Sequence, residues 1–146
     1  MARELDASVW RGTVLVVDDD EAVRLSLRAI LEDTCEVLEA PDGEGALRIL
    51  RNRTVDIVTL DQQMPGLSGL DVLRRIKALD PTIAVALITG VHEVQTAVET
   101  IRLGAIEYVV KPFDVDTILR LVRRASEGGT LGGGGVDPPA GRSVAL

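Results

Sequence analysis

The feature that most constrains the fold of this chain is a regular alternation between short apolar runs and amphipathic stretches. Runs such as "TVLVV" (13–17) and "TIAVALIT" (82–89) have the nearly continuous apolar character of strands buried on both faces. The stretch after the first run repeats its apolar residues at helical spacing, on a face formed by Val23, Leu27, Ile30 and Leu31. This strand–helix pattern occurs five times and predicts a single doubly wound α/β domain, in which helices cover both faces of a parallel five-stranded sheet.

The individual elements can be placed from the same pattern. We expect the strands at 13–17, 36–40, 55–61, 82–89 and 108–111. The helices are expected at 21–31, 44–50, 70–79 and 94–101, with a last helix that begins at 115. Asp20 and Asp114 are suitable N-caps for the first and last helix, since a short acidic side chain accepts hydrogen bonds from the free N–H groups there. Gly104 predicts the end of the fourth helix.

The composition changes abruptly after residue 125, where the sequence becomes rich in Gly and Pro and loses its period. Such a composition indicates a flexible tail or linker. We therefore divide the chain into an N-terminal extension (1–11), one folded domain (12–125) and a Gly/Pro-rich tail or linker (126–146).

Charge and cysteine content limit the class of function. A formal net charge of −7 argues against direct nucleic-acid binding by this chain, because phosphate neutralisation needs clustered Lys and Arg. The single cysteine excludes an internal disulfide and fits a reducing compartment. No apolar run approaches the ~20 residues of a membrane span, and no signal peptide opens the chain. We expect a cytoplasmic protein without a membrane segment.

Polar residues follow the predicted strands one after another. Asp18 to Asp20 follow the first strand, Asp61 closes the third, Thr89 the fourth and Lys111 the fifth. In open α/β sheets, ligands bind beyond the carboxyl ends of the strands, at the point where the strand order reverses. We therefore expect these side chains to meet at one rim of the sheet.

The residue types at this rim predict phosphoryl chemistry with a divalent cation. Clustered carboxylates repel one another, and a hard cation such as Mg²⁺ would relieve that repulsion. A carboxylate can also act as a nucleophile that forms an aspartyl phosphate. Lys111 would supply a positive charge for the phosphoryl oxygens, and Thr89 a hydrogen bond to one of them.

Four segments of the sequence carry a family resemblance. "VLVVDDDEAV", "VDIVTLDQQMPGLSGLDVL", "VALITG" and "GAIEYVVKPFDVD" resemble the receiver domain of bacterial two-component response regulators, over roughly Gly12 to Ala125. The resemblance implies a flavodoxin-like fold with the sheet order 2-1-3-4-5. It also implies phosphorylation of one aspartate by a sensor histidine kinase, in a signalling domain that catalyses only its own phosphorylation and dephosphorylation.

The resemblance also assigns the acidic residues position by position. Asp61, before "QQMP", matches the phosphoacceptor. Asp18 and Asp19 match the acidic pair that holds Mg²⁺, Asp19 directly and Asp18 through water. The backbone carbonyl of Gln63 matches the remaining protein ligand of the metal.

Three further positions match the switching residues of the family. Thr89 matches the switch hydroxyl, Lys111 the lysine that contacts the phosphoryl group, and Tyr108 the aromatic whose rotamer follows phosphorylation. The family's lysine–proline pair, here Lys111-Pro112, usually has a cis peptide bond. Phosphorylation would change the face formed by the fourth helix, fifth strand and fifth helix, which controls an output domain or partner and can support a phosphorylation-dependent homodimer.

A second function remains open at this point. Mg²⁺-dependent phosphatases of the haloacid-dehalogenase type place an aspartate nucleophile after the first strand in an Asp-x-Asp pattern, which Asp18 and Asp20 satisfy. Two features argue against this alternative. Asp114 and Asp116 open a helix instead of completing a strand-end pair, and the loop "DQQMPG" has no place in the phosphatase motifs.

The output of the chain also remains open. It acts either alone through protein contacts or as one part of a longer regulator. The segment 95–125 most resembles receivers attached to sigma-54-type transcription activators.

Overall fold

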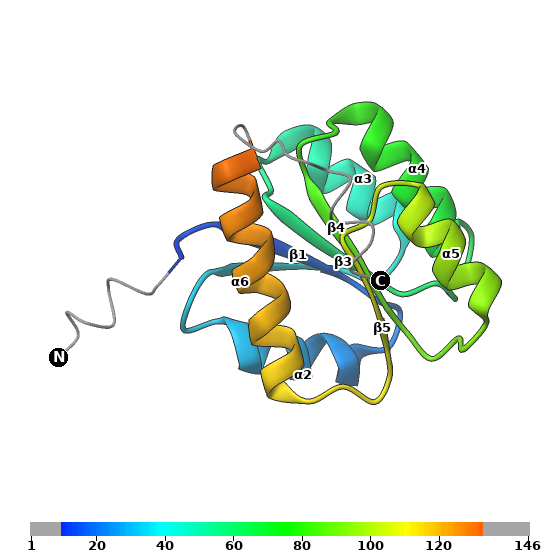
Figure 1. Ribbon diagram of the computed structural model, residues 1–146, viewed down its shortest axis with the longest axis horizontal. Helices are drawn as coiled ribbons and strands as arrows, with labels where there is room; N and C mark the ends of the chain where they lie inside the picture. Colours follow the sequence, from blue (N-terminus) through cyan, green and yellow to red (C-terminus); the bar gives the residue numbers. More distant parts are fainter. Residues whose placement is uncertain (1–9, 133–146) are drawn as a thin grey trace, which may run out of the picture.

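The computed structural model describes residues 10–132 of the chain. Within these residues, five parallel strands form one sheet, and five helices pack against it (Figure 1). The strands are β1 (Thr13–Val17), β2 (Glu36–Ala40), β3 (Ile57–Leu60), β4 (Ala84–Thr89) and β5 (Glu107–Val110). The helices are α2 (Glu21–Leu31), α3 (Gly43–Asn52), α4 (Gly69–Leu79), α5 (Val94–Arg102) and α6 (Val115–Gly132).

The sheet has the order β2-β1-β3-β4-β5, so the predicted fold class and strand order are confirmed. β1 lies between β2 and β3, with Leu15 in register with Leu38 on one side and Val58 on the other. The chain therefore reverses its direction of winding between β1 and β3. Crevices at such a reversal are where ligands bind in this class of fold.

Two apolar layers explain why the central strands read as continuous apolar runs. Along β1, Leu15 and Val17 face a core shared with α3 and α4, whereas Val14 and Val16 face a core shared with α2 and α6. Figure 1 shows α2 and α6 together on one side of the sheet. Since both faces are covered, the side chains from Val14 to Val17 are shielded from water, and the next polar side chains lie where the strand ends.

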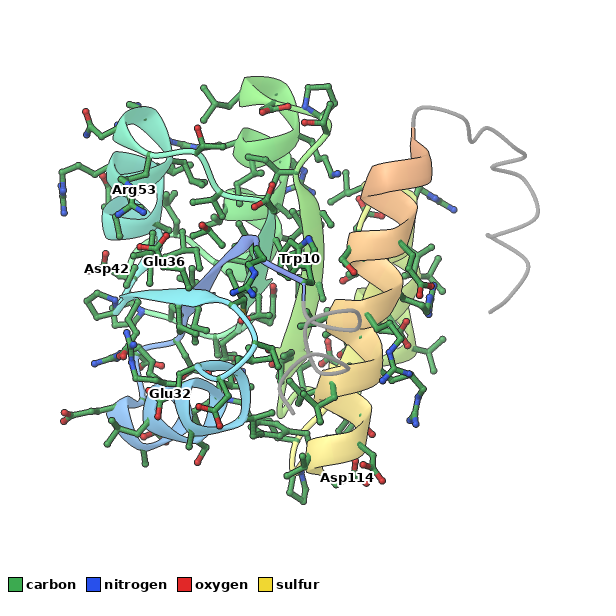
Figure 2. All side chains as sticks on the ribbon, turned by 90° about the vertical axis from the view of Figure 1, so that its left-hand side faces the viewer. Trp10, Glu32, Glu36, Asp42, Arg53 and Asp114 are labelled. Carbon is green, nitrogen blue, oxygen red and sulfur yellow. The ribbon has the colours of Figure 1, made fainter. Side chains whose placement is uncertain are left out.

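The predicted caps are confirmed. Asp20 accepts a hydrogen bond from the Ala22 N–H at the start of α2, at 2.9 Å. Asp114, labelled at the start of α6 in Figure 2, accepts one from the Thr117 N–H at 2.8 Å. Gly104 follows α5 with a φ of 103°, a conformation that glycine adopts without strain.

Most boundaries agree with the expected ones to within one or two residues; β3, for example, spans Ile57–Leu60 and not 55–61, and β5 spans Glu107–Val110 and not 108–111. Two further differences concern β4 and α6. β4 begins at Ala84 and not at Thr82, because the Thr82 N–H and hydroxyl both bond to Asp80 in a local turn that keeps Thr82 out of the sheet. α6 continues to Gly132, past the position at which the composition changes. Residues 133–146 of the expected tail and 1–9 of the expected extension lie outside the described residues. No helix in the described part of the chain has the length and apolar character needed to cross a membrane.

Candidate functional site

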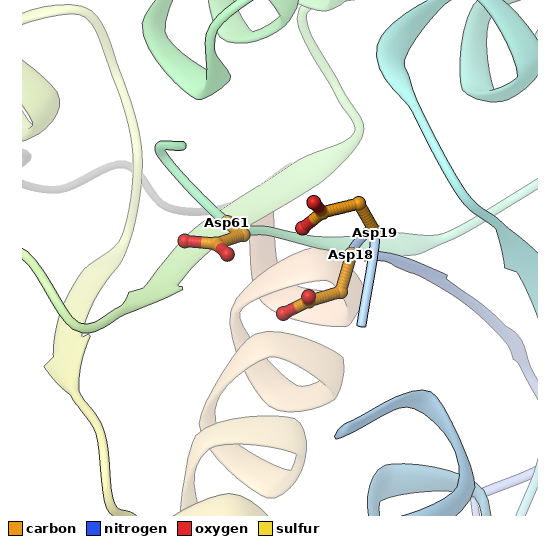
Figure 3. A group of neighbouring side chains, drawn as sticks. All are labelled: Asp18, Asp19 and Asp61. Atoms are coloured by element: carbon orange, nitrogen blue, oxygen red, sulfur yellow. The ribbon is translucent and has the colours of Figure 1, made fainter. Parts of the chain in front are cut away.

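Three aspartates come together at the carboxyl ends of β1 and β3. The Asp61 N–H donates to the Val17 carbonyl at 3.1 Å, which extends the pairing of the two strands by one residue and sets Asp61 beside Asp18. One carboxylate oxygen from each of Asp18, Asp19 and Asp61 lies within 4.8 Å of the others, as Figure 3 illustrates. The predicted meeting of the acidic residues at one rim is therefore observed.

Lys111, from the end of β5, compensates the two buried carboxylates of this cluster. Its Nζ lies 2.8 Å from Asp18 Oδ2 and 3.2 Å from Asp61 Oδ2. Asp18 is 2% exposed and Asp61 7% exposed, so neither can rely on water to stabilise its charge. A single ammonium group shared by two aspartates reduces their repulsion but leaves the cluster with a net negative charge.

Burial and charge act in opposite directions on these groups. Burial raises the pKa of Asp18 above its ordinary value, although the hydrogen bonds from Lys111 and from the Asp20 N–H oppose this rise. Burial alone would lower the pKa of Lys111, but the hydrogen bond and charge of Asp18, together with Asp61, raise it overall. Lys111 is therefore a permanent cation at neutral pH, suited to contact an anionic group.

The loop between β1 and α2 is held by contacts that orient Asp18. The Asp20 N–H donates to Asp18 Oδ1 at 2.9 Å, and the Arg24 guanidinium donates to the Asp18 carbonyl at 2.7 Å. Asp19, between them, is exposed. The burial of Asp18 and the exposure of Asp19 give the two residues of the acidic pair different access to a solvated ion.

Thr89 and Tyr108 meet at the loop between β4 and α5. Thr89 is fully buried, and its Oγ1 accepts a hydrogen bond from the Val91 N–H at 3.2 Å. The Tyr108 hydroxyl donates to the carbonyl oxygen of the same Val91. The Lys111 N–H donates to the Thr89 carbonyl at 2.8 Å. Val91 thus links the two predicted switch residues through its own peptide groups.

The predicted site residues therefore fall into two groups. Asp18, Asp19, Asp61 and Lys111 form one contiguous cluster. Thr89 and Tyr108 form a second group around Val91, joined to Lys111 through the backbone. Gln63 is the second residue after Asp61, the predicted phosphoacceptor, and its backbone nitrogen lies 3.4 Å from Asp61 Oδ1. The peptide bond Lys111-Pro112 is cis, as the resemblance implies.

Sequence reasoning missed Arg24, which holds the Asp18 backbone, and did not predict that the backbone of Val91 joins Thr89 to Tyr108. An arginine on an amphipathic helix looks like any solvated basic residue, and Val91 makes these contacts only through its backbone. Neither contact therefore leaves a signal in the pattern of residue types.

The donor set of the cluster fits a hard divalent cation. Its ligand atoms are carboxylate oxygens from three residues, which is the chemistry that Mg²⁺ and similar ions take. The excess of negative charge that Lys111 leaves uncompensated favours a cation at the same place. Because Asp19 is exposed, such an ion could keep part of its water shell.

Comparison with known proteins defines the family. Residues 14–123 match the model of the response regulator receiver domain, which covers most of the chain. The chain belongs to this family and is a receiver domain of the two-component response regulator class. The match does not favour the phosphatase alternative.

Individual relatives agree with this assignment. The chain is 38% identical over 118 residues to the DNA-binding transcriptional regulator NtrC of Escherichia coli K12, across 79% of this chain but only 25% of NtrC. It is 33% identical to the sporulation initiation phosphotransferase F of Bacillus subtilis, across 76% of this chain and 90% of that protein. The crystal structure of NtrX from Brucella abortus superimposes with a TM-score of 0.79 at 35% identity, covering 84% of this chain and 28% of that one.

Proposed function

We propose that this receiver domain is a phosphorylation-controlled signalling switch, in which Asp61 accepts a phosphoryl group from a sensor histidine kinase. The observation that carries this proposal is the cluster of Asp18, Asp19 and Asp61 with Lys111 bridging the two buried carboxylates. Phosphoryl transfer depends mostly on positioning and on charge neutralisation, and the cluster is suited to both.

The transfer itself uses groups of this chain. A carboxylate oxygen of Asp61 forms a bond to phosphorus while the bond between phosphorus and the donor's imidazole nitrogen breaks. The imidazole leaves with the electron pair and takes up a proton. Lys111, already 3.2 Å from Asp61, contacts the phosphoryl oxygens, and the Thr89 hydroxyl donates to one of them.

Mg²⁺ is the cofactor that we propose for this site. Asp19, Asp61 and the backbone carbonyl of Gln63 would hold it directly, and Asp18, already engaged by Lys111, through water. When bound, the ion neutralises charge on the carboxylates and on the incoming phosphoryl group. On this proposal the domain is not an enzyme in the ordinary sense, because it catalyses only the phosphorylation and dephosphorylation of its own aspartate.

Phosphorylation would act on the face formed by α5, β5 and α6. When Thr89 turns toward the phosphoryl group, it gives up the hydrogen bond from the Val91 N–H. The Tyr108 hydroxyl donates to the carbonyl oxygen of the same Val91, so a movement of this residue affects both side chains. A local charge change at Asp61 would then bias the β4–α5 loop between two arrangements. Val94 and Val98, which are 76% and 49% exposed on α5, would belong to the surface that changes.

The partner that reads this face is an output domain or a separate protein, or a second copy in a phosphorylation-dependent homodimer. The likeness to NtrC, of which this chain spans a quarter, supports a place within a longer regulator. We propose a cytoplasmic location and no direct nucleic-acid contact by this chain. The division into residues 1–11, 12–125 and 126–146 belongs to the same proposal.

Intact-mass spectrometry after incubation with Mg²⁺ and acetyl phosphate tests the proposal. We expect one phosphoryl adduct in the wild type, lost in Asp61→Asn and in the absence of Mg²⁺. An adduct that survives Asp61→Asn but disappears in Asp18→Asn would instead support a phosphatase-type nucleophile. If neither acetyl phosphate nor a phosphorylated histidine kinase yields an adduct, the proposal is wrong.

A further inference from the structure

Gln62, the residue after Asp61, makes two hydrogen bonds to the start of α4. Its side-chain Oε1 accepts from the Leu70 N–H at 2.9 Å. Its backbone carbonyl accepts from the Gly69 N–H at 3.0 Å. The first N–H groups of a helix have no partner within the helix, so Gln62 satisfies two donors that would otherwise be free.

The backbone of α4 also packs directly on the strand end. A Cβ atom at Gly69 would lie 2.5 Å from the Asp61 carbonyl oxygen and 2.8 Å from the Gln62 Cα. The helix can approach this closely only because residue 69 has no side chain. The two ends of the loop from Asp61 to Gly69 are therefore held together by two hydrogen bonds and a tight backbone contact.

The remaining cap of α4 is local. The Asp71 N–H donates to Ser68 Oγ at 3.1 Å, and the Ser68 N–H donates to Asp71 Oδ2 at 3.2 Å. This capping box stabilises the helix without touching the strand end. In the first turn of α4, the Gly69 and Leu70 N–H groups are thus the donors that bind Gln62.

The helix to which Gln62 is tied is firmly anchored. Val72, Leu73 and Ile76 of α4 are completely buried in the core on this side of the sheet. A contact with such an element fixes the position of the residue that makes it. The orientation of Asp61 therefore depends on its own strand and on the first turn of α4.

We propose that Gln62 is a positioning residue for Asp61, whose side chain fastens the strand end carrying the phosphoacceptor to α4. The inference rests on the proposed function of Asp61. Supporting residues of this kind typically change metal affinity or activity by about ten- to a hundredfold when removed. Nothing in the type or spacing of Gln62 distinguishes it from a solvated loop residue.

The test compares Gln62→Met, which keeps the length of the side chain and removes the acceptor, with Ser68→Ala, which removes the other cap of the same helix turn. Hydrogen exchange of the Leu70 amide reports the contact itself. Mg²⁺ affinity is measured by calorimetry without any phosphodonor, and the phosphorylation rate with acetyl phosphate at saturating Mg²⁺. Gln62→Asn, in which the amide is one methylene too short, serves as a second variant.

We expect Gln62→Met and Gln62→Asn to expose the Leu70 amide and to weaken Mg²⁺ binding and slow phosphorylation by about tenfold. Ser68→Ala is expected to lower the unfolding midpoint as much as the two Gln62 variants do, but to change Mg²⁺ affinity less than twofold. Equal Mg²⁺ affinities and phosphorylation rates in all three variants would overturn the positioning role. A wild type that binds Mg²⁺ but accepts no phosphoryl group would count against the proposed function, while the Mg²⁺ affinities would still decide the role of Gln62.

Discussion

At the scale of single residues, the central feature is one ammonium group between two buried carboxylates. Lys111 contacts both Asp18 and Asp61, and burial makes the charge of each aspartate costly without it. The ammonium group contacts two of the carboxylates that would hold a metal ion, and its positive charge repels such an ion. Lys111 therefore opposes Mg²⁺ binding electrostatically while it favours an incoming phosphoryl group.

Lys111→Met separates these two effects. Removing the cation leaves the acidic cluster more negative, so Mg²⁺ binding should become tighter by at least several-fold, because one unit charge at about 4 Å contributes about 1 kcal/mol even at the dielectric constant of bulk water. Phosphorylation by acetyl phosphate at saturating Mg²⁺ should become slower by about a hundredfold, because the charge on the phosphoryl oxygens loses its partner. Calorimetry and phosphorylation kinetics measure the two quantities. A parallel fall in both would show that the side chain supports the fold of the site and not its charge balance.

At the scale of the elements, the rim is held by contacts between a helix and the strand end beside it. Arg24 and Arg28 of α2 both donate to Glu39 of β2, at 3.1 and 2.6 Å, and Arg24 also reaches the Asp18 carbonyl. The hydrogen bond from Arg28, with further help from Arg24, holds the pKa of Glu39 below its ordinary value although partial burial opposes this. This network joins α2 and β2 to the loop that carries the acidic pair.

Glu39→Gln should lower the free energy of unfolding at pH 7 by about 1 kcal/mol, since two charge-assisted contacts lose their charge. A carboxylate with a lowered pKa in the folded state stabilises the fold above its unfolded-state pKa of about 4.3 and loses this contribution as the pH falls through the folded-state value. The two proteins should therefore converge in stability as the pH falls from about 4.3 through the lowered folded-state pKa of Glu39. Urea denaturation across this pH range measures the difference, and a difference that does not depend on pH would refute the electrostatic explanation.

The close approach of α4 to β3 gives a second prediction at this scale. Gly69→Ala would place a Cβ 2.5 Å from the Asp61 carbonyl oxygen, so the helix and strand end must move apart. We expect a loss of about 1–3 kcal/mol in the free energy of unfolding, as in other overpacked positions. Gly90→Ala is the matched control, because a Cβ there would meet nothing within 4 Å. Equal stabilities of the two variants in urea denaturation would contradict the predicted clash.

At the scale of the whole molecule, the fold places residues from β1, β3, β4 and β5 at one rim, and much of this was predictable from sequence. β1 and β2 were predicted with their observed bounds, β1 because it is an apolar run that ends at three aspartates and β2 because the turn residues Pro41-Asp42-Gly43 follow it. The strand order came from the family resemblance, since alternating strands and helices alone are compatible with several orders. The meeting of the acids at the strand ends followed from the parallel sheet.

The finer contacts of the site could not be predicted. The bond from Arg24 to the Asp18 carbonyl and the bond from Leu70 to Gln62 each join a side chain to the backbone of another element. Such contacts have no periodicity and no preferred spacing along the chain, so a single sequence carries no trace of them. The same holds for the end of α6 at Gly132, which lies in a stretch whose composition suggests a linker.

Binding of Mg²⁺ should stabilise the whole domain. An ion at about ten times its dissociation constant adds about 1.4 kcal/mol to the free energy of unfolding if it binds only the folded state. The thermal unfolding midpoint should therefore rise with Mg²⁺, and Asp19→Asn should reduce the rise. Glu32→Gln, which removes an equal charge from an exposed position after α2, should retain it. A rise that is the same in all three proteins would place the ion elsewhere.

The proposed role of Asp61 is best tested by locating the phosphoryl group on the chain. Borohydride reduces an acyl phosphate on aspartate to the alcohol of homoserine, so treatment after phosphorylation marks the acceptor permanently. Peptide mass spectrometry of the phosphorylated and reduced protein should find homoserine at position 61 alone, and only when Mg²⁺ was present. Homoserine at position 18, or phosphate that resists borohydride and remains on a hydroxyl side chain, would contradict the role of Asp61.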